Sequence, residues 1–121
     1  MSRILVVDDN EEILEIISLI LKGEGYQVKA SITGNDLLGI VSDFKPDLIL
    51  LDIILGGFDG RVLCNTLKAN RGTAHVPVIL MSAAHNLKVA HCPADGYIAK
   101  PFEIEYLVER VAALIKKPAV Q

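Results

Sequence analysis

The sequence is poor in the residues that build disulfide frameworks, metal sites and membrane spans. Its 121 residues include no tryptophan and only two cysteines, and Cys64 and Cys92 lie 28 positions apart without a CxxC pattern. We expect both to be free thiols. The three histidines have neither the HxxxH spacing nor the cysteine neighbours of a zinc site. No apolar run approaches the roughly 18 residues that a membrane span requires.

Positive charge and leader-like segments are also scarce. Twelve lysines and arginines stand against fifteen aspartates and glutamates, for a net charge of −3, and the basic residues are scattered apart from Lys116-Lys117. Because a nucleic-acid surface needs a basic cluster, we expect no direct binding of nucleic acid, and no binding to membranes. The apolar run before Asp8 is too short for a signal peptide, and we expect a cytoplasmic protein.

The chain does have enough apolar sequence for one well-packed domain. Hydrophobic residues make up 51% of it and charged residues 22%, which excludes disorder. A chain of this length forms one domain rather than two. We place that domain at residues 1–117 and treat residues 118–121 as a tail or the start of a linker.

Short apolar runs alternate with amphipathic stretches along the whole chain. The runs predict strands at 3–7, 27–31, 48–51, 76–81 and 97–99, and the stretches predict helices at 10–23, 34–44, after Gly60, and at about 102–116. Strands separated by helices form a parallel sheet that is covered on both faces. The sequence therefore predicts an α/β domain.

Two of the predicted helices have an apolar face that we expect to be buried. In the first helix this face comprises Ile13, Ile16, Ile17, Ile20 and Leu21. In the last helix it comprises Ile104, Leu107, Val108, Val111, Leu114 and Ile115. The first helix then has Leu14, Ser18 and Lys22 on a separate, exposed stripe.

Polar side chains follow four of the predicted strands at the point where each strand ends. Asp8 and Asp9 follow the first strand, Asp52 the third, Ser82 the fourth and Lys100 the fifth. The carboxyl ends of parallel strands meet at one edge of a sheet, where open α/β folds bind their ligands. We therefore expect three carboxylates, a hydroxyl and an amine to converge on one rim.

The expected cluster carries more negative than positive charge. Three carboxylates against one lysine leave about two excess negative charges, and two carboxylates about 4 Å apart repel by roughly 4 kcal/mol at an effective dielectric constant of 20. Either the pKa values of the carboxyl groups rise or a divalent cation balances the site. Oxygen donors in a water-accessible cleft favour Mg²⁺ over zinc or copper. Together with the lysine, Mg²⁺ would attract a phosphoryl group.

Each member of the cluster also has an ordinary alternative. Asp8 and Asp9 suit the amino end of a helix, Asp52 could open a turn, Ser82 could cap a helix, and Lys100 could simply leave a strand. The combination is more specific than any part, because four independent strand ends have to coincide.

Longer motifs around these positions resemble the receiver domain of response regulators, the phosphoacceptor module of two-component signalling. The matching segments are 6–10 (VVDDN), 46–52 (PDLILLD), 58–60 (FDG), 81–83 (MSA) and 97–102 (YIAKPF). The resemblance spans essentially the whole chain. It implies a three-layer, doubly wound (βα)5 flavodoxin-like fold whose five-stranded parallel sheet has the order 2-1-3-4-5.

The resemblance also implies roles for the residues at the rim. Asp52 would accept a phosphoryl group from a phosphohistidine of a sensor histidine kinase or phosphotransfer protein. Asp9, Asp52 and the backbone carbonyl of Ile54 would bind Mg²⁺, with Asp8 acting through water or orienting the cluster. Lys100 would pair with a phosphoryl oxygen.

Ser82 and Tyr97 would form the switch of such a domain. The Ser82 hydroxyl would donate to another phosphoryl oxygen, and its movement would vacate space into which Tyr97 turns. An output domain or a downstream protein would read the altered face. The chain would then be a signalling module rather than an enzyme, one that at most assists its own phosphorylation and dephosphorylation.

The chain departs from the receiver pattern at two places. Gly56 stands four residues after the predicted phosphoacceptor, where the family usually has proline, and the Gly56-Gly57 pair predicts a more flexible loop without loss of a ligand. Only 18 positions separate Ser82 from Lys100, fewer than in the family pattern. We expect a short or irregular helix in this interval.

In receiver domains the first helix resembles a docking surface for the kinase. We therefore assign a partner-binding role to Leu14 and Ser18, which lie on the stripe that we expect to be exposed. Leu14 would pack against the helical bundle of the partner.

Three alternative functions fit the sequence to different degrees. A receiver-fold interaction module that is never phosphorylated is compatible with the shortened interval. A small Mg²⁺-dependent phosphatase with an aspartate nucleophile commonly needs a second acid where this chain has Ile54, and the chain has no room for a substrate cap. A flavin binder needs a Ser/Thr-rich loop after the first strand, where Asp8 and Asp9 would repel its phosphate.

Overall fold

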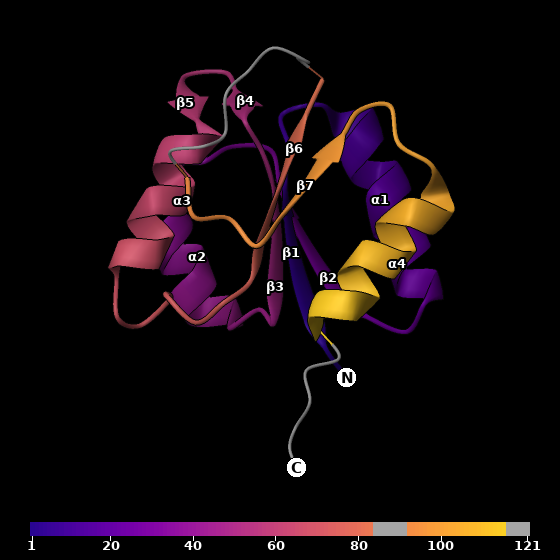
Figure 1. The fold of residues 1–121 in the computed structure, drawn as a ribbon, viewed down its shortest axis with the longest axis horizontal. Coiled ribbons are helices and arrows are strands. Elements are labelled where there is room, and N and C mark those ends of the chain that lie inside the picture. Colours follow the sequence, from indigo (N-terminus) through magenta and orange to yellow (C-terminus); the bar gives the residue numbers. More distant parts are fainter. Residues whose placement is uncertain (84–91, 116–121) are drawn as a thin grey trace.

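A central parallel sheet organises the chain. The computed structural model describes residues 1–83 and 92–115, and Figure 1 shows their arrangement. In chain order the elements are β1 (Arg3–Val7), α1 (Glu11–Gly23), β2 (Gln27–Ser31), α2 (Leu37–Phe44), β3 (Leu48–Asp52), β4 (Ile54–Leu55), β5 (Phe58–Asp59), α3 (Gly60–Ala69), β6 (Val78–Ser82), β7 (Gly96–Ala99) and α4 (Ile104–Ile115).

The five-stranded sheet has the order β2-β1-β3-β6-β7, and each neighbouring pair is parallel. Counted among the sheet strands alone, this is the order 2-1-3-4-5. Figure 1 shows α2 and α3 on one face of the sheet and α1 and α4 on the other. The predicted three-layer, doubly wound α/β fold is therefore confirmed.

The apolar strands contribute side chains to two separate cores, because successive side chains of a strand point to opposite faces of the sheet. Leu5 and Ile49 belong to the core beneath α2 and α3, whereas Ile4 and Leu48 belong to the core beneath α1 and α4. All five residues of β3 are buried. This double burial explains why the strands are apolar throughout rather than alternating with polar residues.

Helix α1 packs on the sheet through most of its predicted face, since Ile17 and Leu21 are buried and Ile13 and Ile20 pack against the same core. Its buried residues are Leu14, Ile17 and Leu21, and the side chain of Leu14 is only 5% exposed. Ile16, predicted to be buried, is 52% exposed. The prediction is wrong at these two positions, Leu14 and Ile16, because α1 carries aliphatic residues almost all round, including the exposed Leu19. Periodicity alone could not fix the two edges of the buried face.

Helix α4 follows its predicted face with one exception. Leu107 and Val111 are fully buried, and Leu114 and Ile115 pack against the same core. Ile104, predicted to be buried, is 56% exposed. It is the first residue of the helix.

The glycine-rich segment after β3 is a two-stranded antiparallel hairpin rather than an unstructured loop. Strands β4 and β5 pair Ile54 with Asp59 and Leu55 with Phe58. Gly56, at the turn, has a φ of 60°. Proline is restricted to a φ near −65°, so this turn excludes proline at the position where the receiver pattern has it, and glycine adopts such a φ without strain.

Several predictions concern residues outside the described part of the chain. The short or irregular helix expected between Ser82 and Lys100 falls largely on residues 84–91, and the tail at 118–121 follows the last described residue, Ile115. The domain boundary at residue 117 therefore stays a prediction. None of the helices within residues 1–83 and 92–115 combines the length and apolar character needed to cross a membrane.

Candidate functional site

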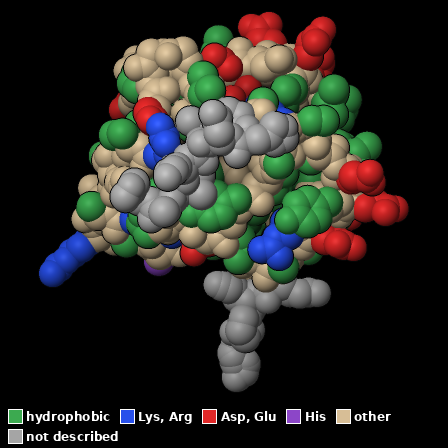
Figure 2. Space-filling model, turned by 45° about the horizontal axis from the view of Figure 1, so that its top comes forward, with side chains coloured by type: hydrophobic (Ala, Val, Ile, Leu, Met, Phe, Trp, Pro, Cys, Tyr) green, Lys and Arg blue, Asp and Glu red, His purple; other side chains and the backbone are tan. Residues whose placement is uncertain are grey.

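The ends of the sheet strands place the predicted polar residues along one edge of the molecule. Asp8 follows β1, Asp52 is the last residue of β3, Ser82 is the last residue of β6, and Lys100 follows β7. Parallel register carries all four to the carboxyl edge. Figure 2 is tilted so that this edge comes forward, and it shows acidic side chains there and along the side formed by α1 and α4.

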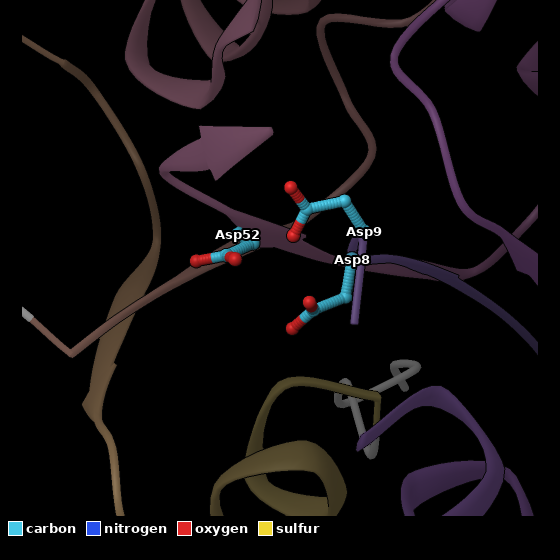
Figure 3. Close-up of side chains that lie close together, drawn as sticks. All are labelled: Asp8, Asp9 and Asp52. Carbon is cyan, nitrogen blue, oxygen red and sulfur yellow. The ribbon is translucent and has the colours of Figure 1, made fainter. Parts of the chain in front are cut away.

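Three carboxylates form a cluster at this edge. One carboxylate oxygen from each of Asp8, Asp9 and Asp52 lies within 4.8 Å of the others, and Figure 3 shows the side chains converging from β1 and β3. Asp8 is fully buried and Asp52 is 6% exposed, whereas Asp9 is exposed to solvent. The cluster is therefore open to water on the side of Asp9.

The ammonium group of Lys100 joins two of the three carboxylates. Its Nζ donates to Oδ2 of Asp8 at 2.6 Å and to Oδ2 of Asp52 at 3.3 Å. The other oxygen of Asp8 accepts the backbone N–H of Asn10 at 2.9 Å. Asn10 also caps α1, since its side chain accepts the backbone N–H of Ile13. The structure thus brings together four of the residues that the sequence placed at strand ends.

The environment of Asp52 disfavours its negative charge. Burial raises the pKa of the Asp52 carboxyl group, and the neighbouring charge of Asp8 raises it further. The charge of Lys100, its hydrogen bond, and a hydrogen bond from the backbone N–H of Ile54 lower the pKa but do not cancel the rise. One lysine therefore leaves this cluster short of positive charge.

The chemistry of the donor set fits a hard divalent cation. Three carboxylates supply oxygen donors that lie within 4.8 Å of one another, and the exposed side at Asp9 leaves access for water. Mg²⁺ prefers such oxygen donors and usually retains several waters. Because a cation would also relieve the unfavourable charge on Asp52, the residues fit the predicted ion.

The hairpin after β3 borders the cluster. The Ile54 side chain is 56% exposed, whereas its backbone N–H faces the Asp52 carboxylate. A Cβ atom built on Gly56 would lie 3.9 Å from Oδ2 of Asp9, so the turn of the hairpin passes close to that carboxylate. The backbone of Ile54 and the turn residue Gly56 thus lie beside the site.

The two predicted switch residues lie on neighbouring strands. Ser82 is half-buried, and its backbone carbonyl accepts the N–H of Lys100 at 2.8 Å. The ring of Tyr97 is 41% exposed, and its hydroxyl donates to the backbone carbonyl of Cys92 at 3.0 Å. Tyr97 therefore lies at the surface, and the switch role of Ser82 and Tyr97 stays a prediction.

The predicted docking residues on α1 fare differently from the rim residues. Leu14 was expected to be exposed, and this expectation is wrong because the residue packs into the core beneath α1 and α4. A side chain that is buried against the sheet cannot contact a partner. Ser18 is half-buried, and its role stays a prediction.

Sequence reasoning treated residues 58–60 only as a turn and missed how they support the site. Asp59 caps α3 by accepting the backbone N–H of Arg61 at 2.8 Å, and its carboxylate pairs with the Arg61 guanidinium at 2.8 Å. The hydrogen bonds from Arg61 hold the pKa of Asp59 below its usual value. Gly60 donates its N–H to the carbonyl of Ile53 at 2.6 Å. An Asp-Gly pair before an amphipathic stretch was the available signal, since aspartate is a preferred N-cap.

Two buried cysteines lie away from the carboxylates. Cys64 and Cys92 are free, as predicted, and belong to the core beneath α2 and α3. Burial, together with a hydrogen bond to the thiol of Cys92, raises the pKa of Cys64 to about 12. A thiol with a raised pKa in an apolar core is a poor nucleophile, so Cys64 serves packing.

Comparison with known proteins agrees with this geometry. The sequence pattern of the response regulator receiver domain matches residues 4–112. The chain is 33% identical over 121 residues to the DNA-binding dual master transcriptional regulator RpaA of Synechocystis sp., covering 97% of this chain and 50% of that protein. It spans about half the length of the curated relatives that it matches.

Solved structures of similar proteins share the fold over nearly all of the chain. A signal receiver domain of a signal transduction histidine kinase from Syntrophus aciditrophicus has 28% identity and a TM-score of 0.88, covering 100% of this chain and 98% of that one. The BeF3-activated N-terminal receiver domain of RstA from Klebsiella pneumoniae has 28% identity and a TM-score of 0.86, covering 96% and 100%.

Proposed function

Because the chain belongs to the response regulator receiver domain family, we propose that it is the phosphoacceptor module of a two-component phosphorelay. One observation carries the proposal: Asp8, Asp9 and Asp52 converge at the carboxyl edge of the sheet, with Lys100 hydrogen-bonded to two of them. Carboxylates and an ammonium group at one edge of the sheet are the groups that phosphoryl transfer to an aspartate would use, and their convergence supports this proposal.

Asp52 is the proposed nucleophile. One of its carboxylate oxygens attacks the phosphorus of a phosphohistidine on a sensor histidine kinase or phosphotransfer protein, and forms the P–O bond of an acyl phosphate. The P–N bond breaks, and its electron pair stays on the imidazole, which takes up a proton. Lys100 already lies beside the Asp52 carboxylate at 3.3 Å, so its ammonium group needs little movement to reach a phosphoryl oxygen.

The acidic residues around Asp52 have a supporting role. Asp9, Asp52 and the backbone carbonyl of Ile54 would hold Mg²⁺, and Asp8 would orient the cluster through Lys100 or through water. The bound ion would supply positive charge to the phosphoryl oxygens. Asp8 is fully buried and bonded to Lys100 at 2.6 Å, which suits a residue that positions the lysine.

Ser82 and Tyr97 would transmit the change to the surface. The Ser82 hydroxyl would donate to the new phosphoryl group, and Tyr97 would turn inward into the space that is released. To do so, Tyr97 must give up the hydrogen bond between its hydroxyl and the carbonyl of Cys92. The face around β7 would change as a result and be read by an output domain or a downstream protein.

Small phosphodonors offer a direct test of the phosphoacceptor role. The protein is incubated with acetyl phosphate and Mg²⁺, and its intact mass is measured alongside two variants, Asp52→Asn and Asp47→Asn. Asp47 is exposed and lies at the opposite end of β3, so it is a matched control. We expect one phosphoryl adduct in the native protein and in Asp47→Asn, and none in Asp52→Asn.

Any other pattern of phosphoryl adducts would contradict the proposed role of Asp52. An adduct in neither the native protein nor the variants, with Mg²⁺ present, would favour an interaction module that is not phosphorylated. An equal adduct in Asp52→Asn would place the phosphoryl group elsewhere. Repeated turnover of phosphate esters would instead indicate a phosphatase.

A further inference from the structure

Gly60 lies where the amino end of α3 meets the end of β3. It is buried, and a Cβ atom built on it would overlap the backbone carbonyl of Asp52 and lie 2.8 Å from Cα of Ile53. Real Cβ atoms essentially never approach other atoms this closely. Both obstructing groups are backbone, so neither can rotate aside as a flexible side chain could.

The same residues are tied together by hydrogen bonds. The N–H of Gly60 donates to the carbonyl of Ile53 at 2.6 Å, and the N–H of Ile53 donates to the carbonyl of Met81 in β6 at 2.9 Å. Ile53 is thus held between α3 and β6. Any substitution that pushes Gly60 outward pulls on this one residue.

Ile53 stands directly between two parts of the proposed site. Asp52 on one side provides the carboxylate, and Ile54 on the other provides the N–H that hydrogen-bonds it. A displacement of Ile53 therefore changes the position of both at once. Metal and phosphoryl sites tolerate such shifts poorly, because supporting contacts commonly affect metal affinity by 10–100-fold.

We propose that Gly60 is a positioning residue of the phosphoacceptor site, whose missing side chain lets α3 brace residues 52–54 in the arrangement that binds a divalent cation and a phosphoryl group. The proposal rests on the proposed function of this site. Gly60 acts through the backbone of Ile53 and does not itself touch the phosphoryl group.

A second glycine in the same segment supplies a matched control. A Cβ atom built on Gly57 would meet no atom within 4 Å, and Gly57 does not have a positive φ. Gly60→Ala and Gly57→Ala are therefore the same chemical change, three residues apart. Val111→Ala adds a control for stability alone, because Val111 is fully buried on α4, in the other core.

The experiment measures Mg²⁺ affinity by calorimetry, and the rate of phosphorylation by acetyl phosphate as a function of Mg²⁺ concentration. We expect Gly60→Ala to weaken Mg²⁺ binding by about tenfold or more and to slow phosphorylation even at saturating Mg²⁺. Gly57→Ala should stay within about twofold of the native protein. Val111→Ala should lower the unfolding temperature but leave the Mg²⁺ affinity unchanged. Equal affinity in Gly60→Ala and Gly57→Ala would overturn the proposal.

Hydrogen exchange on the native protein gives a test that needs no variant. If bracing by Gly60 and cation binding are coupled, Mg²⁺ should slow exchange of the Ile53 and Gly60 amides, because thermodynamic coupling is reciprocal. Unchanged exchange of both amides in a protein that binds Mg²⁺ would contradict the inference. A native protein that binds no Mg²⁺ and accepts no phosphoryl group would instead refute the proposed function itself.

Discussion

The two ends of the sheet differ in how their charged side chains are paired. At the amino end of β6, Nζ of Lys68 donates to Oδ2 of Asp95 at 2.8 Å and to the carbonyl of Val76 at 2.8 Å. The same Asp95 oxygen accepts the N–H of Val78 at 2.8 Å. At the carboxyl end, Lys100 pairs with two of the three clustered carboxylates, those of Asp8 and Asp52.

This difference separates a structural cluster from a functional one. The charges of Lys68 and Asp95 neutralise each other in an ion pair. The pair joins α3 to the segment before β7, so both charges stabilise the fold. The carboxyl end has more negative charge than the fold neutralises, and burial together with the neighbouring charge of Asp8 raises the pKa of Asp52. An end that is left short of positive charge can gain stability from a bound cation, whereas a balanced end cannot.

The largest expected loss of stability comes from removing the Lys68–Asp95 pair at the amino end of the sheet. Asp95→Ala removes the acceptor of both the Lys68 ammonium and the Val78 N–H, and leaves a lysine whose side chain is 15% exposed without its carboxylate. We expect the free energy of unfolding to fall by about 2 kcal/mol, measured by urea denaturation.

An exposed carboxylate at the same end serves as the control. Asp47 accepts the backbone N–H of Arg3 at 2.7 Å, but its side chain lies in solvent. Asp47→Ala should therefore cost less than about 1 kcal/mol. Equal losses for the two variants would show that the Lys68–Asp95 pair has no special structural role.

A smaller effect should appear in the core between the two ends as the pH rises. The pKa of Cys64 is raised from 9.0 to about 12, so the unfolded chain ionises this thiol at a lower pH than the folded protein does. The stabilising contribution is complete below about pH 9 and is lost as the pH rises toward 12. The slope is about 1.4 kcal/mol per pH unit above pH 9.

Cys64→Ala is the variant that isolates this contribution. Unfolding midpoints of the native protein and of Cys64→Ala are compared at pH 8, 9 and 10, with the tyrosines common to both. We expect the native protein to lose about 1 kcal/mol more than the variant between pH 8 and 10. Parallel pH profiles would mean that Cys64 titrates in the folded protein as it does in the unfolded one.

The smallest expected change in the free energy of unfolding comes from removing a charge at the carboxyl end of the sheet. Without divalent cations, Asp52→Asn removes a buried negative charge beside Asp8, so the variant should be more stable than the native protein by about 1 kcal/mol. Thermal unfolding in EDTA measures this gain. Addition of Mg²⁺ should stabilise the native protein much more than the variant and so reduce or reverse the difference.

Asp9→Asn is the control for that experiment, because Asp9 is exposed and has little burial cost to relieve. Its stability in EDTA should stay within about 0.5 kcal/mol of the native protein. A loss of stability in Asp52→Asn, with EDTA present, would show that the Lys100–Asp52 contact outweighs the burial of charge and the repulsion from Asp8.

Residues could be predicted from the sequence where a short stretch around them has a clear pattern of apolar and polar residues. The strand ends at Asp8, Asp52, Ser82 and Lys100 were found from the sequence because each follows a short apolar run that is visible by itself. The face of α1 was found only in part, since aliphatic residues lie almost all round that helix and the edges of its buried face could not be located. Leu14 lies on the stripe that packs against the sheet, and its predicted docking role fails with its exposure.

The sequence by itself determined the order of strands and helices, the residue types at the strand ends and the negative excess among them. These are local properties of alternation and spacing. Only the tertiary structure decided that Lys100 reaches Asp8 across 92 positions of sequence, and that Gly60 must lack a side chain beside Asp52. Such contacts depend on how distant elements pack to within a few tenths of an ångström, and local periodicity carries no information at that scale.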